Sequence, residues 1–112
     1  MSVERRDQVT VVSVTGSLDA DNVHDLEQEL AGSAESEGRA EATVIDLSAL
    51  EFADSSVLHA LLAAQRRHKA LGKRLVLCGP FRPVVHRLFD VTGTAEFFDM
   101  AEDIGTVLPP AR

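Results

Sequence analysis

The sequence predicts a single α/β domain, covering residues 1–112, with a mostly parallel mixed sheet of four or five strands and about four helices. Short runs of β-branched residues alternate along the chain with stretches whose apolar residues recur at helical spacing. The run Thr43–Leu47 is apolar apart from one carboxylate near its end, which is typical of a strand buried on both faces. A chain of 112 residues with 45% hydrophobic content is long enough for one modest core.

Local patterns place the elements of the first half. The run Val9–Thr15 is dominated by β-branched residues and stops at Gly16, which indicates a strand. Several N-cap candidates follow, and from Val23 apolar residues recur every three or four positions, which indicates a helix. A polar stretch of small residues follows. The expected elements are a short strand Val3–Arg6 that pairs through a turn at Asp7 and Gln8, a strand Val9–Thr15 ending at Gly16, a helix from Val23 that fades between Ala31 and Ser36, and a mobile loop Ser33–Glu41.

The second half continues the alternation. Its longest helix is rich in leucine and alanine, carries cations in its last turns and ends at a glycine, as the helix dipole favours. A proline opens a shorter helix, and two adjacent prolines follow the last apolar residues. The expected elements are a strand Thr43–Leu47, a helix from about Ser55 to Leu71, a strand Arg74–Cys78, a helix from Pro83 that stops before Gly93, an edge strand at Phe97 and Phe98, and a terminal helix with Ile104, Val107 and Leu108.

Charge and cysteine content narrow the classes of function. The net charge is −7 and the pI is near 4.9, so the chain as a whole repels nucleic acid and anionic membranes. Cys78 is the only cysteine and is expected to be a small buried residue. With no internal disulfide and no apolar leader segment at its N-terminus, the chain is predicted to be cytoplasmic. No residue pattern indicates a cofactor.

The stretch Asp54-Ser55-Ser56 opens the longest helix and has two interpretations. In the first, a side-chain oxygen only caps the helix, which contributes about 1 kcal/mol. In the second, placement matters, because turns at the carboxyl ends of parallel strands form the functional edge of an open α/β sheet. The turn Gly16–Asp19 belongs to the same edge. We therefore expect Asp19 and Asp54 to lie near each other and near Ser56.

Catalytic and metal-binding interpretations find little support. A serine hydrolase would need a G-x-S-x-G turn, which is absent, and His59 is tied to the same helix as Ser56. A phosphate-binding loop would need a lysine that neither turn supplies. His24, His68 and His86 show no metal-ligand spacing and are expected to be solvated. The basic run from Arg66 to Arg74 is interpreted as charge at a helix C-terminus, with one edge of a partner interface as the minority interpretation.

Taken together and in order, several motifs resemble a STAS domain of the anti-sigma factor antagonist type over nearly the whole chain. The resemblance depends on the following segments: Gly16-Ser17-Leu18-Asp19, Asp46-Leu47-Ser48, Phe52-Ala53-Asp54-Ser55-Ser56, the strand with Leu75-Val76-Leu77, Val85 to Leu88, and Thr92-Gly93. This order and spacing is more specific than any single motif.

The resemblance implies a binding module that is not an enzyme. In that family the second serine of the D-S-S motif, which corresponds to Ser56, is phosphorylated by a serine kinase of the GHKL type that also serves as the anti-sigma factor. The unphosphorylated antagonist binds this kinase and thereby releases the sigma factor, which it contacts only indirectly, and a phosphoserine phosphatase resets the cycle. Asp19, Asp54 and Ser55 surround the phosphosite. Domains of this type are expected to be monomeric when free.

Two residues depart from the family pattern D-S-S-G-L-G. Val57 and His59 replace the two glycines, and a branched side chain at Val57 is expected to slow phosphorylation or to restrict binding to one kinase. We also hypothesise that His59 binds a proton when a phosphate forms on Ser56, against the plainer interpretation of a solvated histidine. Val57 favours the main alternative function, which is an unphosphorylated STAS scaffold in a transport ATPase or a sensory complex.

Overall fold

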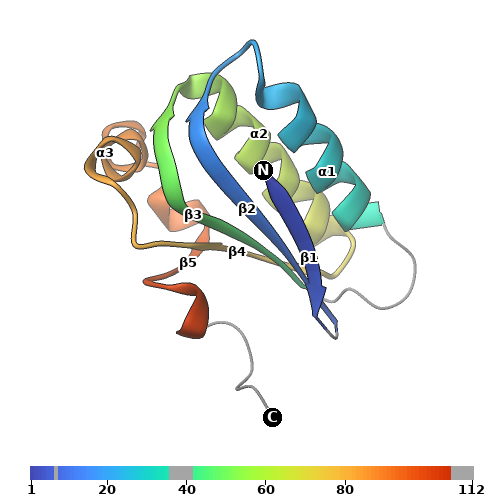
Figure 1. The fold of residues 1–112 in the computed structure, drawn as a ribbon. Helices are drawn as coiled ribbons and strands as arrows, with labels where there is room; N and C mark the ends of the chain where they lie inside the picture. Colours follow the sequence, from blue (N-terminus) through green and yellow to red (C-terminus); the bar gives the residue numbers. More distant parts are fainter. Residues whose placement is uncertain (7, 36–41, 107–112) are drawn as a thin grey trace.

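The computed structural model describes residues 1–6, 8–35 and 42–106, and Figure 1 shows their arrangement. Five strands form one mixed sheet in the order β1-β2-β3-β4-β5. β1 is antiparallel to β2, whereas the other neighbouring strands are parallel. The predicted α/β class with a mostly parallel sheet is confirmed. The strands are β1 Ser2–Arg6, β2 Val9–Leu18, β3 Ala42–Ala53, β4 Arg74–Cys78 and β5 Asp99–Ala101.

Three α-helices and two short 3₁₀ turns accompany the sheet in the described residues. Figure 1 shows α1 and α2 side by side behind the sheet, and α3 packs against β3. None of these helices is long and apolar enough to cross a membrane. Their bounds are α1 Val23–Glu35, α2 Ser55–Ala70, α3 Pro83–Thr92, η1 Ala95–Phe97 and η2 Ile104–Thr106.

The hydrophobic core lies on both faces of the central strands. The larger cluster fills the space between the sheet and the helices, with Ile45, Leu61 and Phe89 among its members. A smaller cluster of Val11, Val44, Val76 and Cys78 lies on the other face. Because successive side chains of a strand point to opposite faces, the complete burial of both Val44 and Ile45 shows that β3 is covered on both sides. Burial raises the pKa of Cys78 to about 11, as expected for an inert thiol.

β2 and β3 are longer than predicted. Gly16 does not end β2, because its positive φ of 75° lets the chain continue where a β-branched residue would be strained. Two register shifts, between Ser13 and Thr15 and between Gly16 and Ser17, keep β2 paired with β3 as far as Leu18 and Ala53. β4 pairs with β3 only as far as Cys78 and Asp46. The ends of β2 and β3 therefore extend beyond the rest of the sheet.

The C-terminal segment also differs from expectation. At the predicted edge strand, Phe97 is instead the last residue of η1, Phe98 follows it in an extended conformation, and β5 begins at Asp99. Phe98 is buried because its ring packs edge-on against Phe89, with centroids 5.6 Å apart. The predicted terminal helix is the short turn η2 from Ile104, while residues 107 and 108 lie outside the described part. Of the predicted mobile loop, residues 33–35 belong to α1 and residues 36–41 lie outside the described part.

His68 was expected to be solvated, but it is completely buried between α2 and the sheet. Its Nδ1 lies 2.8 Å from the carbonyl oxygen of Ala64, which can only accept, so Nδ1 carries the proton. Its Nε2 then accepts a hydrogen bond from the hydroxyl of Thr43 at 2.8 Å. Both ring nitrogens are satisfied in the neutral form. Burial is the main influence that lowers the pKa of His68, and the positive charge of Lys73 lowers it further. The hydrogen bond to the Ala64 carbonyl raises this pKa but does not outweigh the other two influences.

This geometry predicts that acid destabilises the fold through His68. Below the ordinary histidine pKa of 6.5, the unfolded chain binds a proton that the folded chain excludes, so stability falls as the pH falls from about 6.5 toward the lowered folded value. Urea unfolding at pH 7.5 and 5.5 should show a loss in the wild type of up to about 1.4 kcal/mol per pH unit more than in His68→Gln. His24→Gln, which alters an exposed histidine of α1, should keep the wild-type dependence. Equal pH slopes in wild type and His68→Gln would contradict this account.

Candidate functional site

The carboxyl ends of β2 and β3 lie next to each other, so the aspartates that follow them start from neighbouring points of the sheet. Leu18 and Ala53 are the last paired residues of the two strands, and Asp19 and Asp54 follow them directly. The backbone N–H of Ala20 also donates a hydrogen bond to the carboxylate of Asp54. The loop after β2 and the N-terminus of α2 are therefore joined at this edge of the sheet, which is where open α/β domains place their functional groups.

Asp54 is the N-cap of α2. Its backbone is extended, with φ −105° and ψ −173°, and its Oδ1 accepts a hydrogen bond from the backbone N–H of Ser56 at 2.9 Å. The same oxygen accepts a short hydrogen bond from the hydroxyl of Ser56. Capping is thus one role of this carboxylate, and holding the Ser56 hydroxyl in a fixed orientation is another.

These contacts hold Asp54 in its charged form. The hydrogen bond from the Ser56 hydroxyl is the largest influence that lowers the pKa of Asp54, whereas partial desolvation acts in the opposite direction. Backbone N–H groups of Ser56, Val57 and Ala20 lower the pKa further. An ionised acceptor therefore stands beside the Ser56 hydroxyl.

The loop after β2 is ordered by a pair of short polar side chains. The Asp19 carboxylate accepts a hydrogen bond from the N–H of Asp21 at 2.9 Å. The amide oxygen of Asn22 accepts from the N–H of Asp19 at 2.8 Å, and its amide nitrogen donates to the carbonyl of Ser17 at 3.0 Å. From the sequence, Asn22 was expected only to be one of several N-cap candidates, with Asp19 and Asp21, before the helix that begins at Val23. The three-residue spacing of Asp19 and Asn22 was the available signal for this local network.

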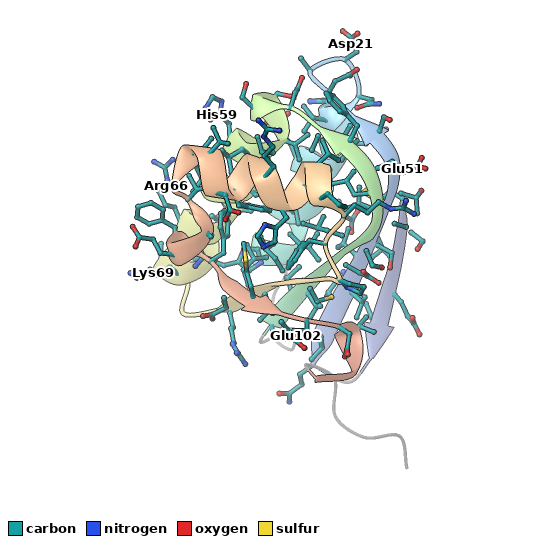
Figure 2. All side chains as sticks on the ribbon, turned by 90° about the vertical axis from the view of Figure 1, so that its left-hand side faces the viewer. Asp21, Glu51, His59, Arg66, Lys69 and Glu102 are labelled. Carbon is teal, nitrogen blue, oxygen red and sulfur yellow. The ribbon has the colours of Figure 1, made fainter. Side chains whose placement is uncertain are left out.

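The serines and the histidine of the site differ in exposure. Ser56 is half-buried and Ser55 is exposed, so neither hydroxyl is sealed inside the core. His59 is exposed three residues after Ser56, on the same side of α2, and Figure 2 shows its side chain pointing outward in the same upper part of the view as Asp21. The Ser56 hydroxyl donates to a carboxylate and not to an imidazole. Within the described residues, no group of three or more His, Cys, Asp or Glu side chains could hold a metal ion.

Val57 does not occupy the surface position expected for it. Its side chain is only 1% exposed and belongs to the main core cluster. The reason is its place on α2, because Val57, Leu61, Ala64 and His68 recur at three- and four-residue spacing and all face the sheet. A branched side chain at this position therefore supports the core and cannot obstruct a partner beside Ser56.

The fold and this edge of the sheet define a small α/β domain whose exposed polar groups surround a capped helix N-terminus. The chain matches the family model described as "Mlab, STAS domain" over residues 1–102. It belongs to the STAS domain family.

Several proteins that this chain resembles carry the name anti-sigma factor antagonist. A Bordetella bronchiseptica protein that carries the name anti-sigma factor antagonist BtrV is 26% identical over 101 residues, which cover 90% of this chain and 84% of that protein. The crystal structure of an anti-sigma factor antagonist from Mycobacterium paratuberculosis has a TM-score of 0.82 at 30% identity, covering 94% of this chain and 86% of that one. The Bacillus protein SpoIIAA in its phosphorylated form has the same fold, with a TM-score of 0.72 at 20% identity and 95% of each chain covered.

The link between Ser56 and Asp54 predicts a change in acid titration. Ser56→Ala removes the hydroxyl that most lowers the pKa of Asp54, so this pKa should rise toward the ordinary value of 3.8. An aspartate whose pKa is lowered by folding stabilises the fold above the pKa of the unfolded chain, and this contribution is lost as the pH falls through the folded pKa. Ser56→Ala should therefore reduce the contribution of Asp54 to the free energy of unfolding. Carboxyl carbon NMR titration measures the shift. Ser55→Ala serves as the control, and an unchanged Asp54 titration in Ser56→Ala would refute the assignment.

Proposed function

We propose that this protein is an anti-sigma factor antagonist whose binding is switched by phosphorylation of Ser56. In its unphosphorylated form it binds a serine-kinase anti-sigma factor of the GHKL type, which then releases its sigma factor. The kinase phosphorylates Ser56, and a phosphoserine phosphatase restores the binding form. The family membership and the two antagonist relatives support this proposal. The single observation that carries it is the accessible Ser56 hydroxyl at the capped N-terminus of α2.

The position of Ser56 suits a group that is modified without unfolding the domain. A phosphoserine adds a charge of about −1.5 to −2 and three acceptor oxygens. At a helix N-terminus, the free N–H groups and the dipole favour an anion, so the first turn of α2 can tolerate the phosphate. SpoIIAA of Bacillus, which shares the fold, is known as a structure in both unphosphorylated and phosphorylated forms.

The effect of the phosphate therefore falls on the surface that meets the partner. Asp19 and Asp54 already make this edge negative, and phosphorylation replaces the hydroxyl donor that satisfies Asp54 with a dianion. A partner surface that fits a hydroxyl between carboxylates then meets a bulky group of high negative charge. Each tenfold loss of affinity requires only about 1.4 kcal/mol, so a local clash is sufficient to release the partner.

Substitutions at Ser56 should separate binding from its regulation. Ser56→Ala should bind the kinase as tightly as the unphosphorylated wild type and should not be released by ATP, because it cannot accept a phosphate. Ser56→Asp should bind at least about tenfold more weakly, since it places a fixed charge at the same position. Isothermal titration calorimetry measures both affinities, with Ser55→Ala as the control that keeps the wild-type response. Equal affinities of Ser56→Ala and Ser56→Asp would count heavily against the switch.

The alternative function, an unphosphorylated STAS scaffold of a transport ATPase or a sensory complex, was favoured by Val57. Because the Val57 side chain is buried, it gives that alternative no support from surface shape. Incubation with the kinase and ATP, followed by mass mapping, distinguishes the two functions. Phosphate on Ser56 that is lost in Ser56→Ala supports the switch, whereas stable binding without modification supports the scaffold.

His59 offers a refinement of the same switch. We propose that it binds a proton when the dianion forms on Ser56, because opposite charges three residues apart on a helix attract each other. NMR titration of the His59 ring protons should then differ between the phosphorylated and unphosphorylated proteins, while those of His24 on α1 should coincide. Coinciding His59 titrations would remove this refinement and leave the proposed switch intact.

A further inference from the structure

One edge of β2 is only partly covered. β1 pairs with residues 9–13 of β2, and the ladder ends where Ser2 pairs with Ser13. β2 nevertheless continues to Leu18 while paired with β3 on its other side. In Figure 1 the N-terminus of the chain lies beside α1, and β2 continues past it toward the top of the view. Within the part of the chain that the structure describes, no strand pairs with residues 14–18 of β2 along their outer edge, and Met1 lies at the near end of this stretch.

A groove of about 560 Å³ runs along this open edge, between β2 and α1. Thr15, Ser17 and Leu18 line it from the strand, and Met1 lines it next to the start of β1. Asp25, Leu26 and Glu29 are among the residues that line it from the helix. The groove thus combines an open strand edge with a helical wall.

An open strand edge presents backbone N–H and C=O groups that an extended peptide can pair with. The positive φ of Gly16 bends β2 within this stretch. The bend and the adjacent register shift keep the edge too short and too twisted for a long flat strand. The backbone therefore favours a few residues of extended chain over edge-to-edge pairing of whole sheets.

The side chains of the groove select for positive charge. Asp25 and Glu29 are four residues apart on α1, so both carboxylates lie on the wall that faces β2. No lysine or arginine is among the described residues that line it, and the positive group that a lining residue does carry is the α-amino group of Met1, so the two carboxylates outnumber it. The net charge of −7 also attracts positively charged molecules to the protein as a whole.

We propose that this groove binds an extended, lysine- or arginine-bearing segment of a partner protein, which adds to β2 as a short strand. Its alternate side chains would place cations against Asp25 and Glu29. Asn22, which lines the groove, also bonds to Ser17 and to the backbone N–H of Asp19 in the loop after β2, so the groove adjoins the edge of the sheet that carries Ser56. The inference concerns a separate surface and does not require phosphorylation.

The test uses the full chain labelled with ¹⁵N and an end-capped nonapeptide of alternating valine and lysine. Titration should shift the amide signals of residues 14–18 and of the first turns of α1. The double variant Asp25→Asn/Glu29→Gln should weaken binding by about fivefold or more, as expected for the loss of two exposed charge pairs. Glu27→Gln removes an acid from the same helix that lines the α1–α2 side instead, and it should change the affinity by less than about twofold.

Three further measurements can overturn the proposal. Equal binding by a peptide with glutamate in place of lysine would exclude charge selection. Equal binding by a peptide with N-methylated alternate residues would exclude strand addition. Concentration-dependent self-association through residues 14–18, detected by sedimentation, would assign the edge to a second copy of this chain instead of a partner segment. None of these experiments uses a kinase, so their outcome is independent of the proposed role of Ser56.

Discussion

The pairing of β2 with β3 through to Leu18 and Ala53 is the constraint on which the candidate site depends. It carries two strands beyond the rest of the sheet and ends them at the same level. The loop after β2 and the first turn of α2 then start from neighbouring points, so the Ala20 N–H reaches Asp54. Had β2 ended at Gly16, the loop would start two residues earlier and Asp19 would not follow a residue paired with β3. The two register shifts therefore help to set where the loop after β2 begins relative to α2.

At the end of this ladder, the carboxylate of Asp54 has two roles. Asp54 accepts both the N–H and the hydroxyl of Ser56, so it fixes the helix start and orients the side chain with the same oxygen. A charge added at Ser56 would compete with Asp54 for the donors of the first turn. The consequences of such a change are local, because the buried side of that turn, including Val57, belongs to the core.

Much of this organisation could be predicted from local sequence patterns. The bounds of β4 and the Asp54 cap of α2 follow from β-branched runs, capping residues and glycines, and the Asp-Ser-Ser motif indicated the site. The exposure of individual helix residues was harder to predict. His68 and Val57 were assigned to the surface by residue type or motif position, although they lie seven residues after and four residues before Leu61, which places all three on the buried stripe. The length of β2 was missed because glycine ends many strands but also permits the bend that continues this one.

The attachment of α2 at both ends limits how any signal can pass through the domain. Its first turn is joined to the loop after β2 through Asp54 and Ala20, and its last turns are joined to β3 through the hydrogen bond between His68 and Thr43. Two attachments at opposite ends restrict rotation and sliding of α2 within the domain. We therefore expect a change at one end of α2 to be detected by a partner molecule that contacts that same end.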